Sequence, residues 1–384
     1  MAQSAQTPPF RADHVGSLLR PPELKEAREH AKRGEIDAAQ LRAVEDKCIR
    51  GVAAFQESVG LQSITDGEFR RDWWHIDFLR GFDGVTTVQG ATFGVHFQGA
   101  DEQPPLMRVT AKIRRSKPSM LDHFKFLKSA TKRAPKFCMP SPAMLHARGD
   151  REALKKTYPD PKEFWADLTR AYREEIRDLY QAGCRYLQID DTTIAMMGDP
   201  KVQETFRKLG DDPKADTAMY ADAVNAAIRD VPDDMTVCVH TCRGNFMSTW
   251  LASGSYDFVA ETAFTRLDVD GFFLEYDTER GLAAVRDSGL HRRARQFGLV
   301  GGEGVDAAHV SRWRGEVGRR IRRAARARRG LRQDLRSGGG LRGIADRSRH
   351  GTGGDPALPR HRAGRPPGAA AREDSRSLNG RDEG

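Results

Sequence analysis

The segment VCVHTCRGNF, residues 237–246, places a histidine and a cysteine two positions apart at the end of an apolar run. Alternate side chains of a strand share a face, so His240 and Cys242 would point the same way, together with Cys238. Imidazole and thiolate are ligands that zinc prefers in proteins. A lone H-x-C pair is a weak metal signature, because strong zinc motifs carry four spaced ligands. The pair is therefore a candidate that needs partners from elsewhere in the chain.

Other predicted strands also end on polar residues that can do chemistry. In a parallel α/β barrel the carboxyl ends of all strands meet at one face, so these side chains would converge there. Carboxylates at that face suit binding of an α-ammonium group. The residues are His14 and Ser17, Asp66 and Glu68, Asp190 and Asp191, and Glu275, which follows the apolar run GFFL.

Each of these residues also has a plainer interpretation. His14 could hydrogen-bond a loop, and Asp66 or Asp191 could cap the following helix, which is the commoner role of an Asp after a strand. Glu275 could be a solvated surface carboxylate. Glu261 is a rival carboxylate whose setting, VAETAF, is more typical of a helix. We interpret Cys238 as part of the barrel interior.

The chain from residue 1 to residue 280 alternates predicted strands with predicted helices. This alternation indicates a parallel β/α architecture, and the length favours a (β/α)₈ barrel that is incomplete at its C-terminal units. No G-x-G-x-x-G or G-x-x-x-x-G-K-[ST] motif supports a dinucleotide or phosphate-loop fold. A Gly-interrupted, strand-like segment at about 82–117 predicts a β-rich excursion. The predicted strands are FRADHVGSLL, LQSITDGEF, APKFCMPSPAML, CRYLQIDDTT, MTVCVHTC and DVDGFFLEYD.

Composition limits the setting of the protein. Among 384 residues there are five unevenly spaced cysteines, which do not form a disulfide framework and favour the reducing cytoplasm. No apolar run approaches the ~18 residues of a membrane span, and the first residues lack the pattern of a signal peptide. We therefore expect a cytoplasmic protein with no membrane partner. The sequence does not predict its oligomeric state.

The net charge of +9 is unevenly distributed. Residues 281–384 hold 24 Arg, no Lys, 11 acidic residues and 20 of the 37 glycines, whereas residues 1–280 carry a net charge of −4. We therefore divide the chain into a catalytic barrel, 1–280, and an atypical Arg/Gly-rich tail, 281–384, that would be largely disordered or non-native.

Five motifs in order give the chain a family resemblance. RADHVGSLLRP, ITDGEFRRDWWHIDFL, LQIDD, VHTCRGNF and VDGFFLEYDTER resemble the cobalamin-independent methionine synthases, above all their short single-barrel bacterial members. The similarity runs from about residue 10 to Arg280. It implies a (β/α)₈ barrel and a zinc-dependent transfer of a methyl group from 5-methyltetrahydrofolate, as its polyglutamate, to the thiolate of homocysteine, giving methionine.

The resemblance also implies roles for individual residues. His240, Cys242 and Glu275 match the family's zinc ligands. Glu68 and Asp190 match the carboxylates that bind the amino group of homocysteine and count as catalytic residues here. The segment that holds the amino-acid substrate corresponds to Val15, Gly16 and Ser17, and Trp73, Trp74 and His146 are guesses for folate contacts.

One departure from the family is serious. The family supplies a further cysteine ligand from a later strand, and this chain has no cysteine after Cys242. We hypothesise that the native reading frame is lost near Arg280, because a lysine-free tail rich in Arg, Gly, Ala and Pro is typical of GC-rich DNA read out of frame. The barrel would then be poorly stable and its activity impaired.

Two other functions stay open at this point. A related enzyme could alkylate another thiol, or take its methyl group from a corrinoid donor, with the same barrel and ligands. Alternatively, the run RRIRRAARARRG could bind nucleic acid through its positive charge. Nucleic acid is the weaker candidate, because the run lacks interleaved aromatic residues and follows an acidic body.

Overall fold

The structure is a computed structural model that describes residues 8–10, 12–89, 104–246 and 249–275, all within one compact unit. The predicted boundary at residue 280, the tail 281–384 and the proposed loss of frame lie outside the described residues. The helices are α1 (Pro22–Lys32), α2 (Ala38–Ser58), α3 (Ile76–Leu79), α4 (Leu121–Ala130), α5 (Ala143–Arg148), α6 (Arg151–Thr157), α7 (Pro161–Gln181), α8 (Thr192–Met196), α9 (Pro200–Lys208), α10 (Pro213–Ile228) and α11 (Asp257–Arg266).

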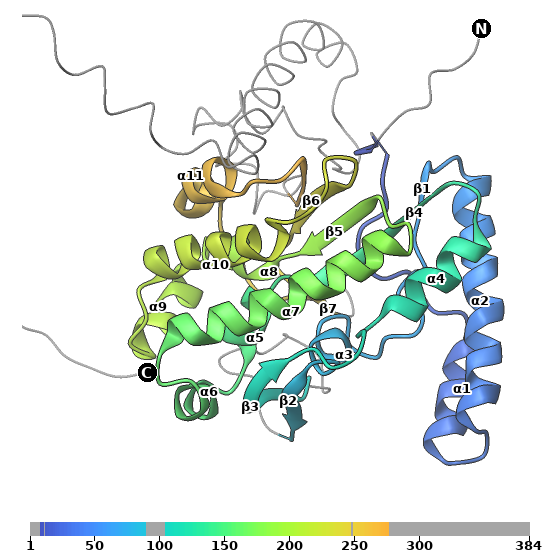
Figure 1. Cartoon of the computed structure of the whole chain (residues 1–384), viewed down its shortest axis with the longest axis horizontal. Coiled ribbons are helices and arrows are strands. Elements are labelled where there is room, and N and C mark those ends of the chain that lie inside the picture. Colours follow the sequence, from blue (N-terminus) through green and yellow to red (C-terminus); the bar gives the residue numbers. More distant parts are fainter. Residues whose placement is uncertain (1–7, 11, 90–103, 247–248, 276–384) are drawn as a thin grey trace, which may run out of the picture. The chain divides into compact units, whose positions relative to one another are not determined.

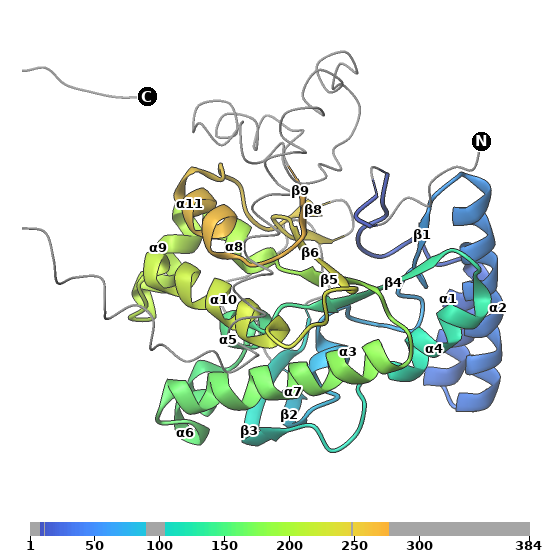
Figure 2. The same ribbon diagram turned by 45° about the horizontal axis from the view of Figure 1, so that its top comes forward.

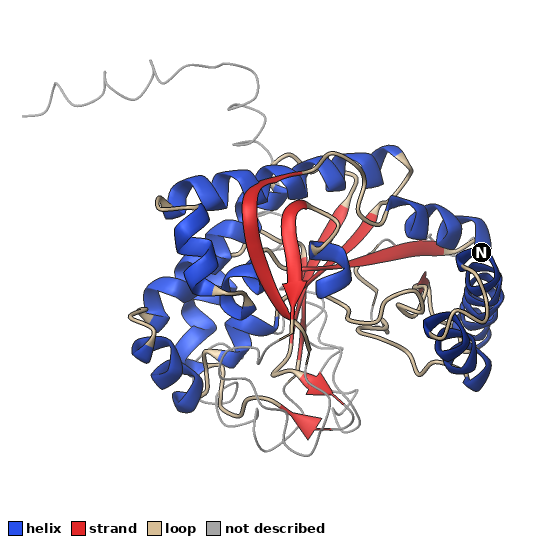
Figure 3. Ribbon diagram, turned by 90° about the horizontal axis from the view of Figure 1, so that it is seen from below, coloured by secondary structure: helices blue, strands red, loops and turns tan. Residues whose placement is uncertain are grey.

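The strands form one central parallel sheet and two small antiparallel pairs (Figure 1). The central sheet has the order β1-β4-β5-β6-β9, in which every pairing is parallel. It is curled (Figure 3), so the chain forms an incomplete (β/α) barrel, as the sequence predicts. The strands are β1 (Ser63–Ile64), β2 (Asp83–Val88), β3 (Leu106–Arg114), β4 (Ala134–Pro140), β5 (Tyr186–Asp190), β6 (Thr236–Thr241), β7 (Asn245–Phe246), β8 (Thr249–Trp250) and β9 (Gly271–Leu274).

The long helices follow one another around the outer side of this sheet. Contacts join α2 to α4, α4 to α7, α7 to α10 and α10 to α11, so the helix order repeats the strand order. Figure 2 shows α4, α7 and α10 along the same side of β4, β5 and β6. This arrangement is the expected result of successive right-handed strand–helix–strand crossovers.

The starts of three helices are encoded by the same Asp-Pro pair. Asp160, Asp199 and Asp212 each cap a helix by accepting a hydrogen bond from a backbone amide of its first turn. The following proline stands at the first helical position, where its missing N–H and fixed φ carry no penalty. The sequence thus ends each preceding loop at a defined residue.

The two faces of the sheet differ in chemistry. One set of alternating residues packs against the helices, and it includes Leu187, Ile189, Val237, Val239 and Leu274. The opposite set lines the concave face, where Phe10, Tyr186, Cys238 and Phe273 form a small cluster. Farther along the same strands this set becomes polar, with Gln188, Asp190 and His240. The concave face therefore changes from apolar to polar toward the carboxyl ends of the strands.

Most of the predicted elements are confirmed, with one clear correction. The β-rich excursion is the antiparallel pair β2–β3, whose connecting residues 90–103 lie outside the described part. The strand expected at FRADHVGSLL is wrong, because its described residues join no ladder. Its backbone bonds elsewhere: the amide of Leu18 donates to the carbonyl of Gly67, and Lys136 donates to the carbonyl of His14.

No helix of the described residues is long and apolar enough to cross a membrane.

We predict that Leu187→Ala lowers the free energy of unfolding by about 2–5 kcal/mol, because a fully buried leucine on the helix-facing side of β5 leaves a cavity. Leu19→Ala is the matched control, since Leu19 is 93% exposed and should change stability little. Urea unfolding followed by circular dichroism measures both. Equal losses for the two variants would contradict the assignment of the core.

Candidate active site

The register of the central sheet places two polar side chains of neighbouring strands side by side. Asp190, the last residue of β5, pairs with His240 of β6. The Nδ1 atom of His240 lies 3.0 Å from Oδ1 of Asp190, and the Nε2 amide of Gln188 donates to the same oxygen at 2.6 Å. Asp190 is only 4% exposed. The carboxylate is therefore buried at the carboxyl end of the sheet and oriented by two donors.

A second carboxylate is buried in the turn after β1. Glu68 is 2% exposed and has a φ of 60°, a left-handed conformation that is unusual for a residue other than glycine. Its Oε2 atom accepts a hydrogen bond of 2.5 Å from Ser17, and its Oε1 atom lies 3.2 Å from Nη1 of Arg71. Burial raises the pKa of Glu68; the Arg71 charge lowers it and the Asp190 charge raises it. Glu68 and Asp190 thus act on each other electrostatically.

Cys242 and Glu275 flank the same strand end. Burial lowers the pKa of His240, but hydrogen bonds to Asp190 and Cys242 and the charges of both outweigh burial and raise it to about 10. Glu275 follows β9, where its amide donates to the carbonyl of Thr241 at 3.3 Å. Its Oε2 atom accepts a hydrogen bond of 2.9 Å from the amide of Arg243. His240 and Cys242 are therefore neighbours, whereas the Glu275 carboxylate is bound to backbone.

Comparison with known proteins shows the family of the chain. The sequence model of the family described as cobalamin-independent synthase, catalytic domain, matches residues 10–292. The chain belongs to this family. The matched range contains every side chain placed above and extends about a dozen residues beyond the Arg280 limit of the motif resemblance.

Relatives of the cobalamin-independent synthase family differ in how well they are known. Protein YxjH of Bacillus subtilis, which is uncharacterized, is 45% identical over 273 residues, covering 71% of this chain and 72% of YxjH. The 5-methyltetrahydropteroyltriglutamate–homocysteine methyltransferase of Thermotoga maritima is 25% identical over 184 residues, 48% of this chain and 24% of that protein. The alignment with YxjH leaves more than a quarter of each protein without a counterpart.

Solved structures of the family share the fold. A Listeria monocytogenes structure, provisionally assigned as a vitamin-B12-independent methionine synthase, is 36% identical with a TM-score of 0.60, covering 81% of this chain and 88% of that one. The B12-independent methionine synthase of a Shewanella species, solved with selenomethionine, has a TM-score of 0.52 and 17% identity over 70% of this chain and 72% of that one. The second likeness concerns the fold alone.

The residues predicted to hold the amino-acid substrate lie on the segment before α1. Ser17 is bonded to Glu68, and Val15 packs against the apolar cluster of the concave face. Gly16 has a φ of 78°, which favours glycine, so the chain can bend between these two contacts. The structure thus brings Ser17, Glu68, Asp190 and His240 to one end of the sheet.

Several candidate residues have structural roles within the described part. Asp191 caps α8 by accepting from Ile194, as the plainer interpretation proposes, whereas Asp66 accepts from the amide of Glu68 within a turn and caps no helix. Glu261 is exposed on α11. Cys238 is fully buried on the concave face.

The guesses for folate contacts lie on two segments, α5 and the loop before α3. His146 on α5 bonds to Tyr220 and Arg151 and stacks among helix residues, including Trp165. Trp73 and Trp74 are partly buried against the main core. The carbonyl of Trp74 accepts a hydrogen bond of 3.2 Å from Arg71, which also pairs with Glu68.

The described residues fit a zinc site only in part. No group of three or more His, Cys, Asp or Glu side chains in this part of the chain has a metal-binding arrangement. His240 and Cys242 supply suitable donors side by side, with His240 oriented by Asp190 as metal-binding histidines commonly are. Glu275 would have to exchange the Arg243 amide for the metal. The strand end thus holds two available metal-ligating side chains, His240 and Cys242, and a third, Glu275, whose carboxylate is hydrogen-bonded to the Arg243 amide.

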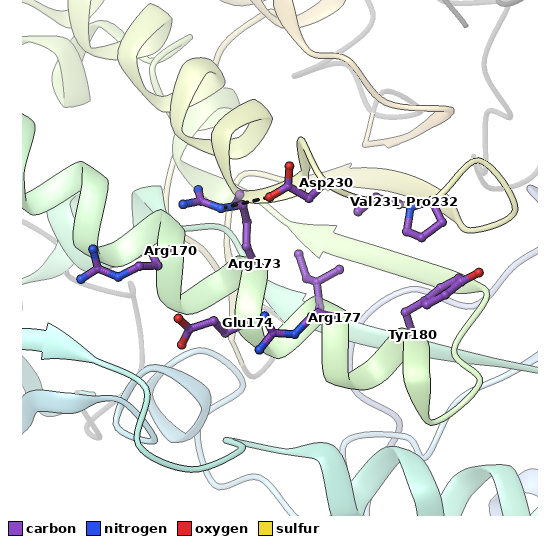
Figure 4. Close-up of a pocket in the computed structure, with 10 residues that line it drawn as sticks. Arg170, Arg173, Glu174, Arg177, Tyr180, Asp230, Val231 and Pro232 are labelled. Carbon is purple, nitrogen blue, oxygen red and sulfur yellow. Dashed lines mark ion pairs between the residues drawn. The ribbon is translucent and has the colours of Figure 1, made fainter. Parts of the chain in front are cut away.

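One surface cavity lies in another part of the fold. A cavity of about 240 Å³ lies between α7 and the loop that leads into β6 (Figure 4). It is lined by Arg170, Arg173, Arg177, Tyr180 and Asp230 among others and contains none of the predicted site residues. It is at the amino ends of the strands, the face that serves stability in barrels of this type.

Sequence reasoning missed three buried polar residues of the site. Arg71 bonds to Glu68 and, at 2.5 Å, to the carbonyl of Cys138. Lys136 and Gln188 line the concave face below Asp190. A sequence signal could have identified Lys136 and Gln188. Both are polar residues inside apolar runs, and Gln188 has the strand parity of Asp190.

His14 makes the stability of the site depend on pH. Burial and then the Lys136 charge lower the pKa of His14 from 6.5 to about 4, and its Nδ1 lies 3.1 Å from the hydroxyl of Thr65. Below pH 6.5 the unfolded chain therefore binds a proton that the folded chain does not. We predict that wild type loses up to about 3 kcal/mol relative to His14→Gln between pH 6.5 and pH 4. Urea unfolding at several pH values measures this, and parallel curves for the two proteins would contradict it.

Proposed function

We propose that this protein is a zinc-dependent methyltransferase that moves the methyl group of 5-methyltetrahydrofolate, as its polyglutamate, to the thiol of homocysteine. The observation that carries the proposal is the buried pair of carboxylates, Glu68 and Asp190, beside the His240–Cys242 strand end. Two carboxylates suit an α-ammonium group, and the H-x-C pair suits a thiol-activating metal. Family membership supports the same reaction class.

The amino-acid substrate would be held by residues of the described chain. The α-ammonium group of homocysteine would donate to Glu68 and Asp190, both buried enough for these bonds to be strong. Val15, Gly16 and Ser17 would line the same end of the substrate, with Ser17 already bonded to Glu68. In the transfer, the bond from the methyl carbon to folate nitrogen breaks, a bond to homocysteine sulfur forms, and the folate nitrogen takes up a proton.

Zinc would be held by His240, Cys242 and Glu275. When bound, zinc would supply a deprotonated substrate thiol at neutral pH. Asp190 keeps His240 in place through Nδ1, which leaves Nε2 as the nitrogen available to the metal. Glu275 would have to turn from the Arg243 amide toward His240.

The activity of this chain would be impaired. The family's further thiolate has no counterpart after Cys242, and the other four cysteines are buried, two of them, Cys138 and Cys238, on either side of Gln188 in the sheet. One thiolate fewer weakens metal binding and leaves the substrate sulfur less electron-rich. The proposal therefore separates two properties: binding of the amino acid should be retained, and methyl transfer should be slow.

We predict that the purified chain binds about one zinc ion, and that His240→Ala and Cys242→Ser each weaken its affinity by about tenfold or more, because each removes a donor. Glu275→Gln should weaken it less, since that carboxylate must first leave a backbone bond. Competition with a chromophoric chelator measures the affinities. Cys48→Ala, on α2, is the control that should leave zinc binding unchanged; zinc binding that survives both site variants would contradict the ligand assignment.

We predict that Glu68→Gln weakens homocysteine binding by about 10- to 100-fold, because a charged hydrogen bond of about 1.5–3 kcal/mol is lost. Glu261→Gln, on the exposed side of α11, is the matched control. Calorimetry measures binding, and turnover with methylfolate should stay below about 0.1 s⁻¹, far under the usual range of enzymes. Turnover that prefers methylcobalamin would replace the folate donor by a corrinoid one, and equal binding by both variants would contradict the role of Glu68.

A further inference from the structure

The concave face of the sheet contains a lysine with no access to solvent. Lys136 of β4 is 1% exposed, and its ammonium group has three acceptors. They are Oδ1 of Asp13 at 2.9 Å, Oε1 of Gln188 at 3.0 Å and the carbonyl oxygen of His14. An ammonium group has three protons and accepts none, so every donor of Lys136 is used.

The Asp13 carboxylate that faces Lys136 is also fully engaged. Its Oδ1 atom accepts from the Ser63 hydroxyl, and its Oδ2 atom accepts from the Tyr186 hydroxyl. Breaking a buried ion pair on one side leaves an uncompensated charge, whereas a fully bonded pair is tolerated in the interior. The Lys136–Asp13 ion pair is therefore held in one position at the base of the site.

Lys136 determines how the Gln188 amide is turned. Because an ammonium group only donates, the Gln188 atom that faces Lys136 must be the carbonyl oxygen Oε1. The amide nitrogen Nε2 then faces the other way, toward Oδ1 of Asp190, to which it donates at 2.6 Å. The orientation of this amide thus follows from the charge beside it.

The hydrogen bond between Asp190 and His240 also has a defined direction. Oδ1 of Asp190 accepts from Gln188 and also lies 3.0 Å from Nδ1 of His240; because an ionised carboxylate only accepts, Nδ1 is the donor in that bond. Nε2 is then the histidine nitrogen left for another partner. One polarised chain of hydrogen bonds runs from Lys136 through Gln188 and Asp190 to His240.

We propose that Lys136 and Gln188 are positioning residues that fix which nitrogen of His240 is turned toward the metal. The metal part of this inference rests on the function proposed above; the hydrogen-bond direction does not. Lys136 also binds the carbonyl of His14, two residues from Gly16, so the same ammonium group locates the segment that would hold the amino acid. The base of the site thereby couples the substrate segment to the metal-binding strand.

The test uses full-length protein labelled with ¹⁵N-histidine. Gln188→Leu removes both of its bonds, and Asp13→Asn/Lys136→Met removes the buried charges together, which avoids leaving one of them unpaired. Gln62→Leu, at an exposed glutamine, is the control. Circular dichroism checks that each variant is folded.

In the wild type loaded with zinc or cadmium, the NMR spectrum should show His240 with its proton on Nδ1 and the metal on Nε2. In Gln188→Leu and in the double variant we expect a mixture of the two forms and zinc affinity about 10- to 100-fold weaker. Single Nδ1–H forms and zinc affinities within twofold of wild type, in folded variants, would overturn the proposal.

The metal-free protein gives a readout that is independent of the proposed function. Its Nδ1–H proton of His240, assigned by its loss in His240→Gln, should resonate at low field and shift in both test variants. If the wild type bound no zinc while this shift appeared, the proposed function would fail and the positioning role would stand. An unshifted resonance in both variants would refute the positioning role.

Discussion

The site depends on placing one ammonium group where water cannot reach it. Burying a charge costs several kcal/mol unless partners replace its hydration, and Lys136 meets this condition only when three separate parts of the chain are in place. β4 carries the lysine, β5 carries Gln188, and the segment before α1 brings Asp13 and the His14 carbonyl. The requirement is mutual, because Asp13 is also buried and needs Lys136. Assembly of the concave face is therefore cooperative.

The register of the parallel sheet then sets the position of each functional group along the strand direction. Cys138 pairs with Gln188, Gln188 with Cys238, and Asp190 with His240, so residues of one parity form successive layers. A shift of one residue in β5 would turn Asp190 and Gln188 toward the helices and expose Ile189 to the polar interior. The apolar residues that face the helices thus protect the positions of the polar ones, although they touch none of the chemistry.

Sequence alone predicts the parts of this arrangement that rest on local pattern. The strand ends at Asp190, His240 and Glu275 follow from apolar runs bounded by polar residues, and the helix starts follow from Asp-Pro pairs. The polar interior was missed because its contacts are long-range: Lys136 meets Asp13 across 123 residues and Gln188 across 52. The strand predicted at FRADHVGSLL failed for the same reason, since its backbone bonds to the Lys136 side chain and the Gly67 carbonyl, which lie far along the chain, and not to a neighbouring strand.

The two halves of the site differ in how completely this sequence provides them. Glu68 binds Ser17 and Arg71, and Asp190 binds Gln188, all within residues 17–190. The proposed metal half ends on Glu275, whose carboxylate accepts a hydrogen bond from a backbone amide, and the sequence has no cysteine after Cys242. A preorganised carboxylate pair stabilises a bound ammonium group whether or not a thiol nearby is activated. Under the proposed function, recognition of the amino acid and activation of its thiol would therefore be physically separable, and loss of the second would not abolish the first.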